Sequence, residues 1–250
     1  MGTIDIELSI VIPAYNEAKR LPDTLFTLYE WIECQKEIIE VIVVDNASTD
    51  DTIAVASHHL NRFENGKVIR CSKRGKGYAV QRGVLECSGQ HVLFMDADGS
   101  AQPSQIPKIR NALNEDVKIV IGSRTGMDGC CVERSLARAL GGKLFSKASA
   151  KLIGVNANDP MCGFKIFDKS VIQKIFPYQK IGGWAFDLEI LFIAGHQNIG
   201  VKEMPIDWKE QPGTKVGLWL DPIVMLIDVL RIPFLHRKTK FQKSGSELNE

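Results

Sequence analysis

Short apolar runs alternate with amphipathic stretches through the first half of this 250-residue chain. Each run has the length of a buried strand, and each stretch between two runs has the length and periodicity of a helix. This alternation is typical of β-α-β units, which form a mostly parallel sheet with helices on both faces. The sequence therefore predicts an α/β fold built on a doubly wound sheet.

The same pattern places the individual elements. The expected strands are Leu8 to Pro13, Val41 to Asp45, Lys67 to Cys71, His91 to Met95 and Lys118 to Gly122. The expected helices are Glu17 to Cys34, Asp50 to Leu60, Lys76 to Glu86 and Pro103 to Leu113. Ser48, Thr49 and Asp50 are candidate N-caps of the second helix. Further along, the apolar neighbours between Trp184 and Phe192 predict a buried helix.

Composition and charge exclude several classes of protein. The hydrophobic fraction of 44% is that of a globular protein, which excludes a disordered chain. The 31 basic and 30 acidic residues nearly balance, so we expect no nucleic-acid partner. Six cysteines without a C-x-x-C pair predict reduced thiols, and acids near the N-terminus argue against a signal peptide. We therefore expect a cytoplasmic protein.

Polar side chains follow several of the expected strands, where open α/β sheets bind ligands. Asp45 and Asn46 follow the second strand, and Asp96 and Asp98 follow the fourth. Two carboxylates one residue apart at a strand end suit a hard divalent cation that also contacts a diphosphate. The alternative is a turn in which Asp98 only ends the strand.

Three further residues each have a functional and a structural interpretation. Lys76, between two glycines at a helix start, would reach a phosphate or belong to a capping loop. Asp159 precedes a turn and would orient a substrate or only form the turn. Asp187 lies among apolar residues, where an acid needs a partner or a role. Asp187 and Glu189 are about 200° apart on a helix, so they do not face one site.

Arginines supply the positive charge that a phosphate acceptor would need. Arg124 follows the fifth strand, at the ligand-binding edge. Arg134 and Arg138 are four residues apart and share one face if that stretch is helical. Their guanidinium groups suit phosphate oxygens. The alternative for this pair is a solvated helix face beside Glu133.

Three motifs in this order resemble the family 2 glycosyltransferases, which have the GT-A fold. They are Ser9 to Glu17 (SIVIPAYNE), Val43 to Asp50 (VVDNASTD) and Asp96-Ala97-Asp98. Within the family, five more segments resemble the polyprenyl-phosphate branch, and above all the dolichyl-phosphate β-glucosyltransferases. These segments are Arg74 to Gly77, Gly122 to Arg124, Arg134 to Arg138, Asp159 to Lys165 and Trp184 to Glu189.

This resemblance implies an inverting, metal-dependent transfer of a hexose to a polyprenyl phosphate, dolichyl or undecaprenyl. The expected donor is UDP-glucose, and the expected cofactor is Mg²⁺ or Mn²⁺. The implied donor-binding residues are Pro13, Tyr15, Glu17, Asp45, Asn46, Lys76 and Asp96, with Asp96 and Asp98 as metal ligands. The implied acceptor-binding residues are Arg124, Arg134, Ser135 and Arg138. The catalytic candidates are Asp96, Asp98, Asp159, Arg124 and Asp187.

Other functions remain open on sequence grounds. One is mannosyl transfer from GDP-mannose to the same kind of acceptor. Another is transfer to a sugar hydroxyl, which would require a general base and for which the sequence lacks a Q-x-x-R-W motif. The non-enzymatic alternative is a nucleotide-sugar-binding or membrane-scaffold protein.

The C-terminal region predicts an amphipathic extension. We expect a glycosyltransferase domain over residues 1–217, and a helix with a basic tail over residues 218–250. The apolar run in this extension is far shorter than the roughly 20 residues that span a bilayer. An apolar helix beside basic residues suits an anionic membrane surface or packing on the domain itself. We expect a peripheral location on the cytoplasmic face of a membrane, and surface positions for all five histidines.

Overall fold

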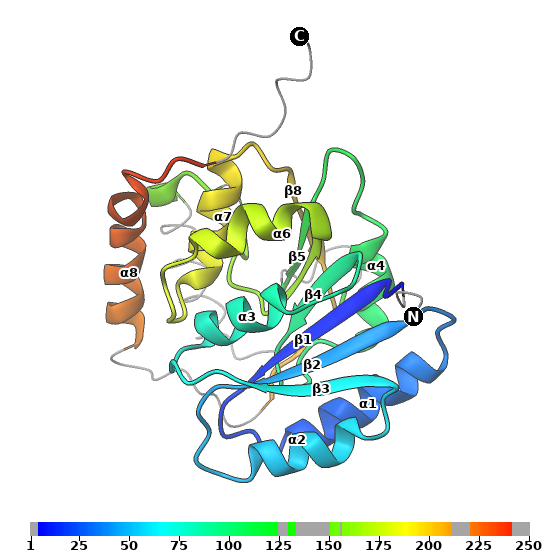
Figure 1. Cartoon of the computed structure of the whole chain (residues 1–250). Coiled ribbons are helices and arrows are strands. Elements are labelled where there is room, and N and C mark those ends of the chain that lie inside the picture. The colour runs from blue at the N-terminus through cyan, green and yellow to red at the C-terminus, as the bar shows by residue number, and fades with distance from the viewer. Residues whose placement is uncertain (1–4, 125–129, 134–150, 156, 212–220, 242–250) are drawn as a thin grey trace.

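A seven-stranded sheet in the order β3-β2-β1-β4-β7-β5-β8 forms the centre of the molecule (Figure 1). The computed structural model describes residues 5–124, 130–133, 151–155, 157–211 and 221–241. Neighbouring strands are parallel except where β7 pairs with β4 and β5. The strands are β1 Leu8–Ala14, β2 Ile39–Asp45, β3 Asn65–Arg70, β4 His91–Met95, β5 Ile119–Ser123, β7 Phe164–Asp168 and β8 Val201–Pro205. The predicted doubly wound, mostly parallel sheet is confirmed.

The predicted helices are present with shifted ends. The structure has α1 Leu21–Glu33, α2 Thr52–Leu60, α3 Lys76–Leu85, and a 3₁₀ turn Pro103–Gln105 that leads into α4 Ile106–Arg110. α1 begins later than predicted because the carbonyl of Glu17 accepts from the amides of Arg20 and Leu21, forming a turn. The N-cap of α2 is Asp51, whose side chain makes no capping hydrogen bond, so the expected caps Ser48, Thr49 and Asp50 are wrong. Asp50 lies one residue earlier, where its Oδ1 accepts from the Thr52 amide at 3.0 Å.

Helices cover both faces of the sheet, and each face has its own apolar core (Figure 1). On one face α1, α2 and α4 bury side chains such as Leu25, Ala56 and Ile109. On the other face α3 packs together with α6 Lys169–Ile175, α7 Phe186–His196 and α8 Asp221–His236. The sheet is therefore buried on both sides, as the continuous apolar strands predict.

Strand β7 was not predicted, and it completes the centre of the sheet. It runs antiparallel between β4 and β5, with Phe94 opposite Lys165. Lys165 interrupts the apolar run of this strand, which hides it from an analysis of hydrophobic patterns. Because β7 is antiparallel, it begins at the edge where its parallel neighbours end. The edge strand β8, and the short pair β6 Val132–Glu133 and β9 Trp208–Lys209, were not predicted either.

The helix predicted around Trp184 to Phe192 is confirmed as α7, which buries nearly all of its residues. α8 follows at one side of the molecule and packs against α7 (Figure 1). None of the described helices is both long and apolar enough to cross a bilayer. The surface position expected for His236 is wrong: the residue is buried, because Glu189 supplies a polar partner inside the protein. The division at residue 217 stays a prediction.

Candidate active site

The two acids after β4 lie at the carboxyl edge of the sheet, where the sequence placed them. The Asp96 amide donates to the carbonyl of Gly163 at 3.0 Å, which ties the end of β4 to the start of β7. Asp98 Oδ1 accepts from the Ser100 amide at 3.0 Å. Burial, and then the negative charge of Asp96, raise the pKa of Asp98. A bound cation would relieve this repulsion between the two carboxylates.

Lys76 joins these acids from the first position of α3. Its Nζ lies 2.5 Å from Asp96 Oδ1 and 5.6 Å from the centre of the Trp184 ring. Burial opposes the charge of this ammonium group, but Asp96 and Asp187 outweigh burial and raise the pKa of Lys76. The predicted helix start is therefore correct, and it brings a cation to the acidic edge.

Sequence reasoning missed the functional importance of Gly163. A Cβ at this position would overlap the Asp96 carboxylate. The close approach of β7 to Asp96 therefore requires glycine. The motif around Gly163 was visible in the sequence, but its contact with Asp96 depends on the unpredicted strand.

Asp187, a catalytic candidate, is buried in α7, where its charge interacts with Asp96 and Lys76. It forms an ion pair with Lys165, with 2.5 Å between Lys165 Nζ and Asp187 Oδ1. Both side chains are at most 3% exposed. Glu189 instead contacts His236 on the other side of α7, which confirms that the two acids of this helix do not share a site.

Arg124 and Asp159 form a two-pronged ion pair at the same edge. Arg124 Nε donates to Asp159 Oδ2 at 2.7 Å, and Arg124 Nη2 donates to Asp159 Oδ1 at 2.6 Å. The guanidinium group also lies 5.1 Å from the centre of the Trp208 ring. Burial disfavours the charged form of both groups, but the hydrogen bonds and the attraction between the two charges have a larger effect. The pKa of Arg124 is therefore raised and that of Asp159 is lowered. The segment that leads into β7 thus supplies the group that orients Arg124.

This ion pair predicts acid lability. Folding lowers the pKa of Asp159. Its carboxylate therefore stabilises the folded protein fully at pH values above the pKa in the unfolded chain, which is near 3.8. That contribution is lost as the pH falls below about 4 through the lower folded pKa. We expect the difference in Tm between wild type and Asp159→Asn to be largest near neutral pH and to shrink in acid. Thermal scans from about pH 7 to pH 3 measure this.

The control for this prediction is Asp116→Asn, which changes an exposed side chain. A difference in Tm between wild type and Asp159→Asn that stays constant down to pH 3 would contradict the prediction.

The residues expected to bind the nucleotide lie at the ends of β1 and β2. Pro13 pairs with Val44 across the two strands, and buried Asp45 accepts from the Ser48 amide. The Tyr15 ring faces a guanidinium group, with Arg74 Cζ 4.7 Å from the ring centre. An aromatic ring and a buried acid at a strand end suit a nucleoside.

Two other residues of the expected pocket bind protein groups. Asn46 uses its amide to hold the following loop: Nδ2 donates to the carbonyl of Lys73 at 2.6 Å, and Oδ1 accepts from the Gly75 amide at 2.7 Å. The buried Glu17 carboxylate accepts from the Arg20 guanidinium group at 2.6 Å. In this structure both side chains are therefore engaged by other groups of the protein.

A cavity of about 320 Å³ opens beside Asp98 on the side of α1. Lys19, Thr24, Gly99 and Gln211 are among its lining residues. This volume lies within the range of small-molecule sites.

The carboxylates fit a divalent cation that shares its coordination with a substrate. Among the described residues, no group of three or more His, Cys, Asp or Glu side chains is arranged to hold a metal. Mg²⁺, however, is commonly bound by one or two carboxylates together with substrate phosphates and water. Asp96 and Asp98 supply this kind of donor set. The predicted acceptor residues Arg134, Ser135 and Arg138 lie outside the described residues.

Residues 9–176 match the family model described as glycosyl transferase family 2. The chain is 36% identical to dolichyl-phosphate beta-glucosyltransferase of Saccharomyces cerevisiae, over 92% of this chain and 76% of that protein. It is 32% identical to the protein of the same name from Homo sapiens, over 85% of this chain and 71% of that protein.

Solved structures with the same fold are glycosyltransferases too. Glucosyl-3-phosphoglycerate synthase from Mycobacterium tuberculosis, in complex with Mn²⁺, UDP and phosphoglyceric acid, superposes with a TM-score of 0.68. That match has 18% identity and covers 97% of this chain and 82% of the other. Mannosyl-3-phosphoglycerate synthase from Rubrobacter xylanophilus superposes with a TM-score of 0.69 and 18% identity. That match covers 97% of this chain and 79% of the other. These likenesses show the GT-A fold, and together with the family match they make this chain a member of glycosyltransferase family 2 and a glycosyltransferase.

Proposed function

We propose that this enzyme transfers glucose, with inversion, from UDP-glucose to a polyprenyl phosphate such as dolichyl or undecaprenyl phosphate. The names of its relatives support this acceptor and sugar. One observation carries the proposal: the acids after β4 and the ion-paired Arg124 after β5 stand at the same edge of the sheet. A donor diphosphate and an acceptor phosphate each need one of these groups.

The donor occupies the half of the edge formed by β1, β2 and β4. Tyr15 and Asp45 bind the nucleoside, and Asp96 and Asp98 hold Mg²⁺ or Mn²⁺. This cation, when bound, stabilises the negative charge that develops on the departing diphosphate. Lys76, already beside Asp96, adds a second positive charge near the same oxygens.

The acceptor phosphate occupies the other half of the edge, at Arg124. A phosphate is already an anion near neutral pH, so the reaction needs no general base. Arg124, fixed by Asp159, holds the phosphate with one oxygen facing the anomeric carbon. That oxygen forms the new bond to carbon as the bond to the diphosphate breaks on the opposite side, which inverts the configuration. Arg134, Ser135 and Arg138 are further candidate contacts for this phosphate.

Asp187 and Lys165 take a supporting role in this proposal. Their ion pair is buried, with neither side chain more than 3% exposed, so we assign it the role of fixing β7 and α7 next to the acidic edge. The acceptor is a membrane lipid, so we place the enzyme peripherally at the cytoplasmic face of a membrane.

Release of nucleoside diphosphate tests this proposal directly. The purified chain is incubated with UDP-glucose, UDP-GlcNAc or GDP-mannose, each with Mg²⁺ or Mn²⁺ and with or without a short polyprenyl phosphate. We expect release with UDP-glucose that depends on the lipid phosphate. A preference for GDP-mannose would show that UDP-glucose is the wrong donor. Growth of an oligosaccharide without lipid phosphate would show that the acceptor is a sugar hydroxyl and not a polyprenyl phosphate.

Asp98→Ala tests the metal site. We expect this variant to lose lipid-dependent transfer by roughly 100-fold or more, because one of the two carboxylates for the cation is gone. Initial rates across a titration of Mn²⁺ measure the effect. Asp116→Ala, at an exposed position, serves as the control. An Asp98→Ala enzyme with undiminished metal-dependent transfer would refute the assigned mechanism.

A further inference from the structure

Helix α8 exposes an apolar face. Six of its large apolar side chains are between 44% and 74% exposed: Ile223, Val224, Leu226, Ile227, Leu230 and Phe234. They make up more than half of the exposed large apolar side chains among the described residues. Single exposed apolar residues are common on soluble proteins, whereas a contiguous group on one helix marks an interaction surface.

The opposite face of α8 is well packed. Met225, Val229, Ile232 and His236 are all at most 9% exposed, and their spacing of four, three and four residues forms one stripe. This stripe contacts the core on the side of α7. The exposed face therefore belongs to a helix that is seated in the protein.

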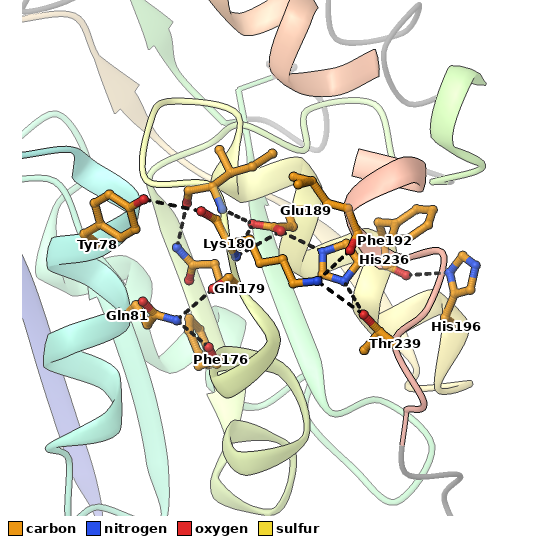
Figure 2. A network of polar contacts seen from close by, with 12 residues as sticks. Tyr78, Gln81, Phe176, Gln179, Lys180, Glu189, Phe192, His196, His236 and Thr239 are labelled. Carbon is orange, nitrogen blue, oxygen red and sulfur yellow. Dashed lines mark hydrogen bonds and ion pairs between the residues drawn. The ribbon is translucent and has the colours of Figure 1, made fainter. Parts of the chain in front are cut away.

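Buried polar contacts fix the rotation of this helix (Figure 2). His236 Nε2 lies 2.7 Å from Glu189 Oε1, and neither side chain is more than 1% exposed. Glu189 also accepts from the amides of Lys180 and Ile181, while Lys180 Nζ donates to the carbonyl of Leu235 at 2.5 Å. Turning α8 to bury its outer face would leave the Glu189 carboxylate without His236 inside the core. The apolar face is thus held outward.

Charge indicates what covers this face. Arg231 lies on its flank, paired with Asp228 at 3.3 Å, and Arg237, Lys238 and Lys240 follow the helix at exposed positions. An apolar helix face beside a group of cations is complementary to the interfacial region of an anionic bilayer.

We propose that the outer face of α8 docks on the surface of an anionic lipid bilayer, with its six apolar side chains among the acyl chains. The surface lies near the active site. Asp228 approaches Gly183, and the carbonyl of neighbouring Gly182 accepts from the Gly77 amide at the start of α3. The inference rests on the proposed function in that a polyprenyl phosphate reaches the site from such a bilayer.

Flotation of the full chain with vesicles tests the docking surface. One set of vesicles is phosphatidylcholine alone and the other adds phosphatidylglycerol; neither contains a polyprenyl phosphate. We expect the wild type to float with the anionic vesicles. Leu230→Gln/Phe234→Gln should bind them about tenfold less or weaker still, because two inserted side chains are lost. Lys238→Glu/Lys240→Glu should weaken binding to the anionic vesicles.

The controls separate docking from folding and from catalysis. Phe26→Gln removes an equally large exposed side chain from α1, on the other face of the sheet, and should bind as the wild type does. Leu230→Gln/Phe234→Gln should keep its Tm and its transfer to a short, water-soluble polyprenyl phosphate without vesicles. Because the flotation assay contains no donor or acceptor, a failure of the proposed function would not alter its result.

Three results would overturn the proposal. The first is failure of the wild type to float with anionic vesicles. A second is equal flotation of Leu230→Gln/Phe234→Gln and the wild type. The third is a dimer in light scattering that this double variant converts to a monomer, which would assign the face to a second copy of the chain.

Discussion

Gly163→Ala is expected to lower the rate of glycosyl transfer by roughly 100-fold or more in a chain that still folds. A Cβ at position 163 would overlap both carboxylate oxygens of Asp96, so this side chain has to turn away. Asp96 would then lose its contact with Lys76 Nζ and its place beside Asp98. Displacement of a substrate-positioning group by about 1 Å costs about 100-fold in rate, and this overlap demands more than that.

Initial rates with UDP-glucose and a short polyprenyl phosphate measure this effect, with Tm as the test of folding. Gly195→Ala is the matched control, because a Cβ at that position on α7 meets no atom within 4 Å. Wild-type rates in Gly163→Ala would show that Asp96 has no fixed position in the reaction.

Lys165→Met is expected to destabilise the protein by about 3–5 kcal/mol. The substitution keeps the apolar part of the side chain, but it leaves the Asp187 carboxylate without its partner in a fully buried position. Burial already raises the pKa of Asp187, and Lys165 counteracts that effect. The carbonyl of Cys162 would also lose a hydrogen bond from Lys165 Nζ. A loss of this size is a large share of the 5–15 kcal/mol that stabilises typical proteins.

Denaturation in urea measures the change in the free energy of unfolding. The double variant Lys165→Met/Asp187→Leu should recover most of the loss, because it removes both charges together. Lys209→Met, which breaks an exposed ion pair with Glu133, should have little effect. Equal losses in the single and double variants would show that packing around residue 165, and not the charge of Asp187, causes the instability.

The parts of the fold that depend on local patterns could be predicted from the sequence. The strands before Asp45 and Asp96 are uninterrupted apolar runs, and Lys76 follows a glycine at a helix start. Each of these signals lies within a few neighbouring residues, so it can be recognised without knowledge of distant contacts. The predictions of the acidic edge and of Arg124 at the same edge followed from them, and the structure brings these residues to one side of the sheet.

The parts that depend on distant partners could not be predicted. β7 carries Lys165 in its middle, and a lysine in a central strand makes sense only once Asp187 stands beside it. His236 was predicted to lie at the surface, because the sequence does not show that Glu189 is its partner inside the protein. Asp159 lies in the loop that leads into β7, so its pairing with Arg124 likewise depends on a strand that hydrophobic periodicity does not reveal.

The position of β7 also governs the order in which the enzyme is assembled during synthesis. β5 pairs with β7 on one side and β8 on the other, so it has no place beside β4 until Phe164–Asp168 has been made. A nascent chain that ends before residue 164 would carry both Asp96 and Arg124, yet would have no strand to join them. The acids after β4 and Arg124 therefore reach one edge of the sheet only after β7 has been made, through a contact of long sequence separation, which is a slow kind of folding step.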